Sequence, residues 1–377
     1  MAPLRVLTAV AVPFEALDGA SVARWRELHE AREEGASPFL HPEYVGAVAA
    51  VRKDVEVCVL LRRGEPVGFV PMQRGPFGVG GPVGGRLCDH SGAIVEPGAP
   101  WSPRQVAEQV GLGALQLRHA EVSESLRIEP ALGTTCEAAH LDLSRGYGGY
   151  RASIRQSGSS FMSQLERRAR KIEAEVGPLR MVWSSDDDHV LAALLEWKAR
   201  QRVRTRTPNV LDLAWARGLI ERLRRARGDG FGGVLSALYA GDTLVAAHFG
   251  IRTRRVLHYW IPAFNVEVSQ YSPGLLALLA LAREAVERGI VRIDLGVGDE
   301  RYKARAASGA RPVVSAVVSG GGTVGTLVGA VHGLRQWSRR TNLDVAVRAS
   351  GRALLRASYT VRGALSPLRR ITSGWRL

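Results

Sequence analysis

Residues 271–303 read YSPGLLALLALAREAVERGIVRIDLGVGDERYK, and this stretch decides the fold of the second half of the chain. Pro273 is suited to the first turn of a helix, where a missing backbone N–H removes no intrahelical hydrogen bond. Gly289 is suited to the position just past the end of a helix, where the backbone turns left-handed. The apolar segment Val291–Leu295 predicts a strand. The stretch therefore predicts a helix that leads directly into a buried strand.

Three more strands are predicted just before this helix, at Gly233–Tyr239, Thr243–Arg252 and Val256–Pro262. Turn residues at 240–242 join the first two as a hairpin. Upstream, the apolar periodicity predicts one strand and three helices, at Arg180–Trp183, Ser160–Glu175, Asp187–Arg202 and Leu211–Arg227. A looser copy of this order is predicted in the first half, at Arg5–Val12, Ser21–Ala31, Val55–Leu61, Val67–Met72 and Ser102–Gly111.

The repeated order predicts an α/β (α+β) chain of two tandem domains, residues 1–150 and 151–315. Each is expected to be a mixed, mostly antiparallel sheet flanked by helices. Residues 316–377 follow as a Gly-rich joint and a basic amphipathic helical tail. The tail has two interpretations: peripheral contact with an anionic membrane, or packing on the second domain with its Arg face in water.

The net charge of +15 over 377 residues is unevenly distributed. Residues 1–150 carry 14 basic and 18 acidic side chains, residues 151–315 carry 27 and 17, and residues 316–377 carry 10 and 1. This distribution excludes a uniformly basic protein that wraps nucleic acid. It fits small phosphorylated partners better than a duplex.

Three cysteines are too few and too scattered for a disulfide framework, and no histidines have metal-ligand spacing. The longest apolar run, Leu275–Ala282, is far shorter than the roughly 20 residues that cross a bilayer. The N-terminus lacks the long apolar region of a secretory signal. We therefore expect a cytoplasmic protein without a metal. Neither Gly-x-Ser-x-Gly nor a Gly-x-x-x-x-Gly-Lys-Ser/Thr loop is present, which disfavours a serine nucleophile and a P-loop.

Three strands, a helix and a strand in this order resemble the core of the GNAT acyltransferase fold. A narrower resemblance rests on Tyr259-Trp260, on Tyr271-Ser272-Pro273-Gly274 and on the run DLGVGDERYK, Asp294–Lys303. Here the chain is similar to bacterial double-domain GNAT proteins, such as the acetyltransferases associated with cellulose biosynthesis and, more distantly, the Fem-type aminoacyltransferases. Glu196-Trp197-Lys198 and Ser37-Pro38-Phe39 fit the same pattern, and the resemblance covers roughly residues 5–310. It implies that the first domain shapes the acceptor site and the second binds the donor and catalyses.

The resemblance implies acyl-CoA, in particular acetyl-CoA, as the donor. A pyrophosphate needs free backbone N–H groups and a positive dipole end, and the helix that starts at Pro273 offers both. Gly274 would let the donor approach closely, so Tyr271, Ser272, Pro273 and Gly274 are the predicted donor-binding residues. The Arg/Gln-x-x-Gly-x-Gly/Ala loop of ordinary GNAT enzymes is absent. The same Ser-Pro-Gly could also simply begin a buried helix.

The predicted catalytic residues are His248, Asp294, Glu300, Tyr302 and Lys303. A base is needed to take a proton from an attacking amine, and His248, Asp294 and Glu300 are the candidates. A histidine on a central strand and a carboxylate at a strand end have structural interpretations too, as a core residue and a cap. Tyr302 has a phenol that is able to protonate a leaving thiolate or to orient an amine. Lys303 is one of only four lysines among 51 basic residues, and a lysine retained in so Arg-rich a chain suggests a specific task, as a point charge for a phosphate or carboxylate. Its structural interpretation is a solvated cation at the edge of a loop.

We expect an N-acyltransferase that moves an acyl group to a small-molecule amine on an amino sugar or a cell-envelope or polysaccharide precursor. Two alternatives stay open. One is a Fem-type transferase that uses aminoacyl-tRNA, although the chain has no coiled-coil-length insertion for tRNA. The other is a non-catalytic envelope-assembly factor at the inner face of the membrane.

Overall fold

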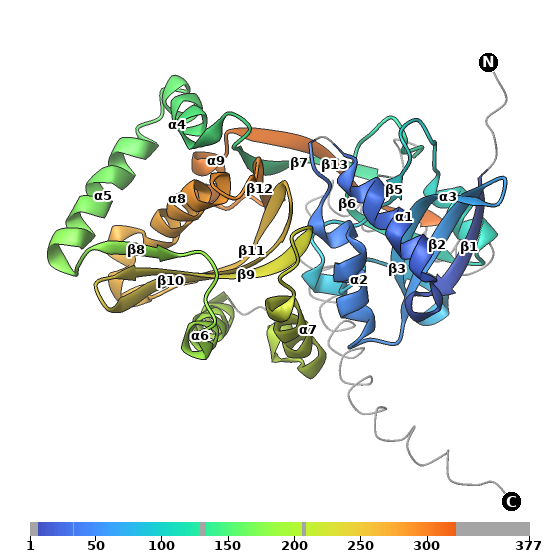
Figure 1. The fold of residues 1–377 in the computed structure, drawn as a ribbon, viewed down its shortest axis with the longest axis horizontal. Helices are drawn as coiled ribbons and strands as arrows, with labels where there is room; N and C mark the ends of the chain where they lie inside the picture. The colour runs from blue at the N-terminus through green and yellow to red at the C-terminus, as the bar shows by residue number, and fades with distance from the viewer. Residues whose placement is uncertain (1–6, 33, 129–132, 206–208, 322–377) are drawn as a thin grey trace, which may run out of the picture.

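The computed structural model describes residues 7–321, except 33, 129–132 and 206–208, and its strands form one continuous sheet through the molecule (Figure 1). The order across the sheet is β1-β2-β3-β4-β6-β13-β7-β12-β11-β10-β9-β8, and β5 pairs with β3. The strands are β1 Thr8–Pro13, β2 Val55–Arg62, β3 Glu65–Arg74, β4 Val79–Gly81, β5 Ile94–Val95, β6 Ala114–Glu121, β7 Gly133–Asp142, β8 Leu179–Val182, β9 Phe231–Ala240, β10 Thr243–Thr253, β11 Val256–Phe264, β12 Arg292–Gly296 and β13 Gly309–Ser319.

Helices cover both faces of this sheet. They are α1 Gly19–Glu30, α2 Pro42–Ala49, α3 Pro103–Gln109, α4 Gly146–Gln156, α5 Phe161–Glu175, α6 Asp188–Thr205, α7 Ala214–Arg225, α8 Pro273–Val286 and α9 Arg301–Ala306. Their ends follow local chemistry: Asp18 caps α1 by accepting from the N–H of Ser21 at 2.6 Å. Gly289, with φ +76°, follows α8, as predicted.

The same order of elements occurs twice, as predicted. In the first half it is β1, two helices, the strands β2 to β4, α3 and β6; in the second it is β8, α6 and α7, the strands β9 to β11, α8 and β12. Each copy has one parallel strand pair, β4 with β6 and β11 with β12. The two copies therefore place their helix-to-strand crossover at equivalent points of the sheet.

Strand exchange joins the two halves. β13 follows the second copy in sequence but lies between β6 and β7, and β7 pairs with β12. The predicted domain limits at 150/151 and 315/316 fall inside α4 and β13. The strand at 309–319 and the helix at 146–156 were not among the predicted elements. The predicted tail helix lies outside the described residues.

Apolar packing also crosses between the halves. One core cluster combines Trp25, Phe39 and Tyr44 of the first half with Leu219 and Phe249 of the second. A second core lies where α4, α5 and α8 meet the sheet, and a third lies under α3. The first-half helices α1 and α2 are therefore part of the wall around the second-half sheet.

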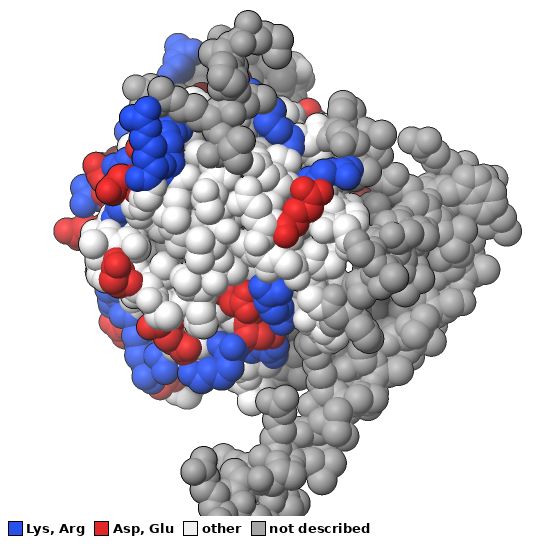
Figure 2. Space-filling model, turned by 90° about the vertical axis from the view of Figure 1, so that its right-hand side faces the viewer, with Lys and Arg blue, Asp and Glu red and all other residues white. Residues whose placement is uncertain are grey.

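Charge is unevenly placed on the surface. Viewed from the end that carries the first-half elements, the described surface has a broad uncharged centre, and Lys, Arg, Asp and Glu gather around its margin (Figure 2). This view shows no continuous basic stripe. Within the described residues, no helix has both the length and the apolar character needed to cross a membrane.

Candidate active site

Strands β11 and β12 run parallel but soon separate. They pair only at Val256–Arg292, Leu257–Ile293 and His258–Asp294. Beyond these pairs, β11 continues to Phe264 and β12 ends at Gly296, and no other described strand lies between them. Gly296 has φ +71°, a left-handed backbone that is easy only for glycine. We call the region beyond His258 and Asp294 the β11/β12 divergence.

The first turn of α8 lies beside β11 at this divergence. The hydroxyl of Tyr259 donates to the carbonyl of Gly274 over 3.5 Å. A Cβ on Gly274 would lie 3.3 Å from the ring of Phe264, so glycine allows the helix and strand to approach closely. Pro273 occupies the first turn, as predicted.

A cation is held at the start of α8. Ser272 has φ 57° and does not cap the helix; its hydroxyl instead accepts a hydrogen bond from Arg168 of α5. The neighbouring Tyr271 is buried and donates to Glu175 of the same helix α5. The predicted donor residues therefore lie together, with a guanidinium at the positive end of the α8 dipole. Two positive features side by side favour an anion there.

His248 lies on the face of β10 that packs against Tyr259. The two rings stack with centroids 4.2 Å apart, and His248 Nδ1 lies 3.1 Å from the hydroxyl of Ser236. Its Nε2 is buried with no hydrogen-bond partner in the described structure. Burial, with smaller contributions from the His258 and Lys198 charges, lowers the pKa of His248 to about 3. A neutral ring of this kind supports Tyr259 and is a poor proton acceptor near pH 7.

Asp294 points to the opposite side of the sheet, where its carboxylate forms a buried ion pair with Arg292. The Asp294 Oδ1 accepts from Arg292 Nε at 2.7 Å, and the guanidinium also donates to the carbonyls of Glu34 and Gly35. Although burial raises the pKa of Asp294, the charges of Arg292 and His90 outweigh this effect and lower it overall. This arrangement attaches β12 to a turn of the first half.

The turn after β12 brings Glu300 and Lys303 together. Lys303 Nζ is 2.9 Å from Glu300 Oε2 and donates to the carbonyl of Val297 at 3.1 Å, while its side chain is buried. A Cβ on Gly298 would lie 2.1 Å from that Glu300 oxygen and 2.8 Å from Nζ, so a larger residue there would displace the ends of both side chains. Tyr302 is half-buried, and burial, followed by the charges of Glu300 and Asp89, raises the pKa of its phenol. It therefore stays protonated and able to donate.

A second lysine lies in the same region. Lys198 of α6 donates from Nζ to the carbonyl of Pro262, on the part of β11 beyond the divergence, at 2.9 Å. The pKa of Lys198 is lowered to about 8, mainly by burial and to a smaller extent by the charge of Arg202. The charge of Glu300 opposes this shift. Two of the four lysines in the chain thus lie within the electrostatic reach of Glu300.

The structure adds two residues that were not among the predicted catalytic set, Asp89 and His258. Asp89 Oδ2 lies 2.9 Å from His258 Nε2, across 169 positions of sequence. His258 is the last residue of β11 that pairs with β12, and a Cβ on Gly296 would lie 3.7 Å from the same Asp89 oxygen. The pair therefore lies at the divergence. The sequence showed only that His258 and Tyr259 point to opposite faces.

Aromatic side chains of the first half form a wall behind this pair. The ring of Phe39, from the Ser37-Pro38-Phe39 motif, lies 4.9 Å from His258 and 5.5 Å from Trp260. The Trp260 indole donates to the carbonyl of Leu87 at 2.9 Å. Both halves therefore contribute to the site. Among the described residues, no three His, Cys, Asp or Glu side chains are grouped so that they could hold a metal ion.

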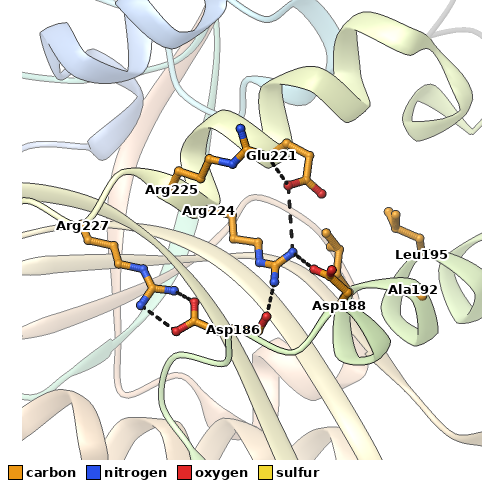
Figure 3. A pocket seen from close by; sticks show the side chains of 9 residues that line it. Asp186, Asp188, Ala192, Leu195, Glu221, Arg224, Arg225 and Arg227 are labelled. Atoms are coloured by element: carbon orange, nitrogen blue, oxygen red, sulfur yellow. Dashed lines mark hydrogen bonds and ion pairs between the residues drawn. The ribbon is translucent and has the colours of Figure 1, made fainter.

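A separate cavity of about 740 Å³ lies between α6 and α7, and its lining residues do not include those at the divergence (Figure 3). Its charges largely neutralise each other: Arg224 pairs with Asp188 at 2.6 Å, and Arg227 pairs with Asp186. Glu221 lies 3.9 Å from Arg224 and 4.0 Å from Arg225. The cavity lacks the convergent unpaired groups of a reaction site.

Comparison with known proteins agrees with this geometry. Residues 159–304 match the model of the acetyltransferase (GNAT) domain family. The match contains β11, α8, β12 and the turn to Lys303. Residues 159–304 are thus similar to the GNAT domain, and the fold of the chain is GNAT-like. No curated protein matches the sequence.

Several solved structures are similar to this chain, and FemX is one whose overall fold agrees with it. FemX has 10% identity to this chain, with a TM-score of 0.51 over 78% of this chain and 93% of FemX. A tandem GNAT protein from the clavulanic acid biosynthesis pathway has 15% identity and a TM-score of 0.44, over 84% of this chain and all of that one. The C-terminal domain of a putative lysylphosphatidylglycerol synthetase from Agrobacterium fabrum has 11% identity and a TM-score of 0.46, over 82% and 94%.

Proposed function

We propose that this protein is an N-acyltransferase that moves an acyl group, in the first instance acetyl, from acyl-CoA to a primary amine. One observation carries the proposal: within the segment that matches the GNAT domain, β11 and β12 separate beside the N-terminus of α8. The unpaired edge of β11 offers backbone groups to an extended donor. The start of α8 with Arg168 offers a site for its phosphates.

In this proposal the residues at the divergence divide the chemistry. Backbone N–H groups at the strand ends would polarise the thioester carbonyl, which is where most of the transition-state stabilisation is expected. The protonated phenol of Tyr302 would supply a proton to the departing thiolate. Glu300, with 55% of its side chain exposed, is the most accessible of the three predicted bases, since His248 is neutral and buried and Asp294 is paired with Arg292.

The acceptor we propose is an amino group on an amino sugar or on a cell-envelope or polysaccharide precursor, following the resemblance to the acetyltransferases associated with cellulose biosynthesis. The first half would bind this acceptor, because Asp89 and Phe39 reach the divergence from that half. The C-terminal segment would hold the enzyme near an anionic membrane that carries such precursors.

The experiment is a thiol-release assay with acetyl-CoA and a panel of primary amines: glucosamine, ethanolamine and lysine. Release of CoA that depends on one of these amines would support the proposal. No release above the amine-free rate with any of them, together with no heat on acetyl-CoA titration, would refute it. Aminoacyl transfer from charged tRNA in a parallel reaction would replace the proposal with the Fem-type alternative.

A further inference from the structure

Asp89 presents a half-buried carboxylate at the point where the two halves meet the divergence. Its side chain is 41% exposed, whereas the His258 imidazole behind it is 0% exposed. His258 binds Oδ2 only, and Oδ1 has no hydrogen-bond donor among the residues that the structure describes. One carboxylate oxygen is thus fixed and the other is available.

The loop that carries Asp89 is held in place by several hydrogen bonds. Arg118 Nη1 donates to the carbonyls of Gly85 and Cys88, at 2.9 and 3.1 Å. The His119 Nδ1 lies 2.9 Å from the carbonyl of Asp89 itself. His119 has φ +45°, an unfavourable conformation for a non-glycine residue, and its N–H donates to Ser315 of β13. Local strain kept at such a position is a feature of binding sites.

A purely structural clamp between the halves is not needed at this point. The buried guanidinium of Arg292 already joins β12 to the carbonyls of Glu34 and Gly35, and Trp260 already binds Leu87. Two buried histidine nitrogens beside Asp89, Nδ1 of His258 and Nε2 of His90, have no partner in the described structure. Both nitrogens therefore remain able to bond a water molecule or a ligand group that reaches them.

The charges around Asp89 leave it free to act on a ligand. The titratable groups that interact electrostatically with Asp89 are the following: His258 of β11, His90 and Cys88 of its own loop, His119 of β6, Lys303 and Tyr302 of α9, and Tyr44 of α2. Lys303 is paired with Glu300 and Asp294 with Arg292. Burial raises the pKa of Asp89, but the hydrogen bond from His258 and the charges of His258, His90 and Lys303 outweigh this and lower it. Asp89 is therefore an anion at neutral pH.

The sheet separates this carboxylate from the donor helix. His258 and Tyr259 are consecutive on β11 and point to opposite faces: Tyr259 reaches α8, and His258 reaches Asp89. A donor bound along α8 and a ligand bound to Asp89 would thus approach the divergence from opposite sides. Such an arrangement would let the amine add to the face of the thioester carbonyl that points away from α8.

We propose that Asp89 is the site that binds the ammonium group of the acceptor, with His258 as the positioning residue that fixes its carboxylate. The inference rests on the proposed function and names the residue that selects a cationic amine. Asp89 then holds the nitrogen near the thioester carbonyl. Glu300 takes a proton from the ammonium before the attack, the free amine forms the N–C bond as the C–S bond breaks, and Tyr302 protonates the departing thiolate.

The test compares Asp89→Asn with wild type for two nucleophiles, an alkyl ammonium from the amine panel and hydroxylamine, which is uncharged near neutral pH. Loss of a charge-assisted hydrogen bond should raise the KM for the ammonium about 10- to 100-fold and leave the Kd of acetyl-CoA unchanged. The rate with hydroxylamine should change by less than about threefold. Asp299→Asn, which neutralises an exposed carboxylate in the turn after β12, is the matched control and should leave both KM values unchanged.

The role of His258 is tested by two substitutions, one that keeps an N–H donor and one that removes it. His258→Gln retains an N–H that can donate to Asp89 and should preserve most of the selectivity for the ammonium, whereas His258→Leu should lose it. If Asp89→Asn does not fold, trimethylammonium, which keeps one N–H and cannot be stably acetylated, and its uncharged analogue tert-butyl alcohol are compared as inhibitors of hydroxylamine acetylation by wild type. The cation should inhibit at concentrations about tenfold lower than the alcohol.

The inference is overturned if Asp89→Asn keeps the ammonium KM within about twofold of wild type, or loses both nucleophiles equally. Equal inhibition by the cation and by its uncharged analogue would also overturn the inference. Failure of the proposed function is separate and is seen in wild type before any variant is made, as absent acetyl-CoA binding or as absent acetyl transfer to every amine of the panel. Wild-type protein that acetylates these amines, combined with an Asp89→Asn variant that has no selective effect on the ammonium KM, would overturn the ammonium site alone.

Discussion

Removal of the Asp294 carboxylate is predicted to destabilise the fold, because Asp294 is half of a buried ion pair. The side chains of Arg292 and Asp294 are 6% and 11% exposed. In Asp294→Ala the guanidinium keeps the carbonyls of Glu34 and Gly35 but loses its only carboxylate partner among the described residues. Breaking one side of a buried pair costs about 3–5 kcal/mol, a large fraction of the 5–15 kcal/mol that stabilises a typical domain.

The assay is urea denaturation of the wild type, Asp294→Ala, Arg292→Met and the double variant. The double variant should be more stable than Asp294→Ala, by about 2 kcal/mol or more, because it leaves no unpaired buried charge. A loss of less than about 1 kcal/mol in Asp294→Ala, combined with complete loss of turnover, would refute this reasoning and return Asp294 to the role of base.

The same ion pair predicts how stability changes with pH. The pKa of Asp294 is lowered in the folded protein, so its contribution is complete above the unfolded pKa of about 3.9 and is lost as the pH falls through the folded value. Wild type should therefore lose stability more steeply than Asp294→Asn at pH values below about 4. Parallel acid unfolding curves for the two proteins would contradict the prediction.

Three further predictions concern other residues of the site. Phe39→Ala should lower the free energy of unfolding by about 3–5 kcal/mol, because Phe39 is 1% exposed and packs against His258 and Trp260. Chemical denaturation measures this loss, and a loss below about 1 kcal/mol would contradict the prediction. Gly298→Ala should lower turnover at least tenfold by displacing Glu300 and Lys303, whereas Gly64→Ala, a left-handed turn glycine with open space around it, should leave turnover intact. Lys303→Met keeps the buried volume but removes the ammonium, and kcat/KM should fall about 100-fold or more; near-normal turnover would remove Lys303 from the site.

Local sequence patterns predicted the second-half fold well, because strands β9 to β11 and helix α8 have clear periodicity and end signals within a few residues. β13 could not be predicted in the same way, because its partners β6 and β7 lie about 170–200 residues earlier in the chain. Its position depends on non-local pairing, which no local pattern records.

The candidate site was predictable in part for the same reason. Lys303 and the start of α8 have local signals, namely the rarity of lysine and the Ser-Pro-Gly sequence. Asp89 has no such signal, since it lies in a Gly- and Pro-rich loop. It becomes a candidate only through its contact with His258 in the folded structure. His248 and Asp294 were reasonable candidates from sequence. Only the structure shows that His248 stacks on Tyr259 and that Asp294 is paired with Arg292.

The most direct measurement for the proposed donor site is calorimetric titration of acetyl-CoA into wild type, Arg168→Ala and Arg167→Ala. Arg168 binds Ser272 at the start of α8, whereas Arg167 is exposed on the same helix, so Arg167→Ala is a matched control. We predict saturable binding by wild type and Arg167→Ala. The affinity of Arg168→Ala for acetyl-CoA should be lower by a factor of at least about ten. Absence of binding by wild type, or equal affinity in all three proteins, would contradict a donor site at the N-terminus of α8.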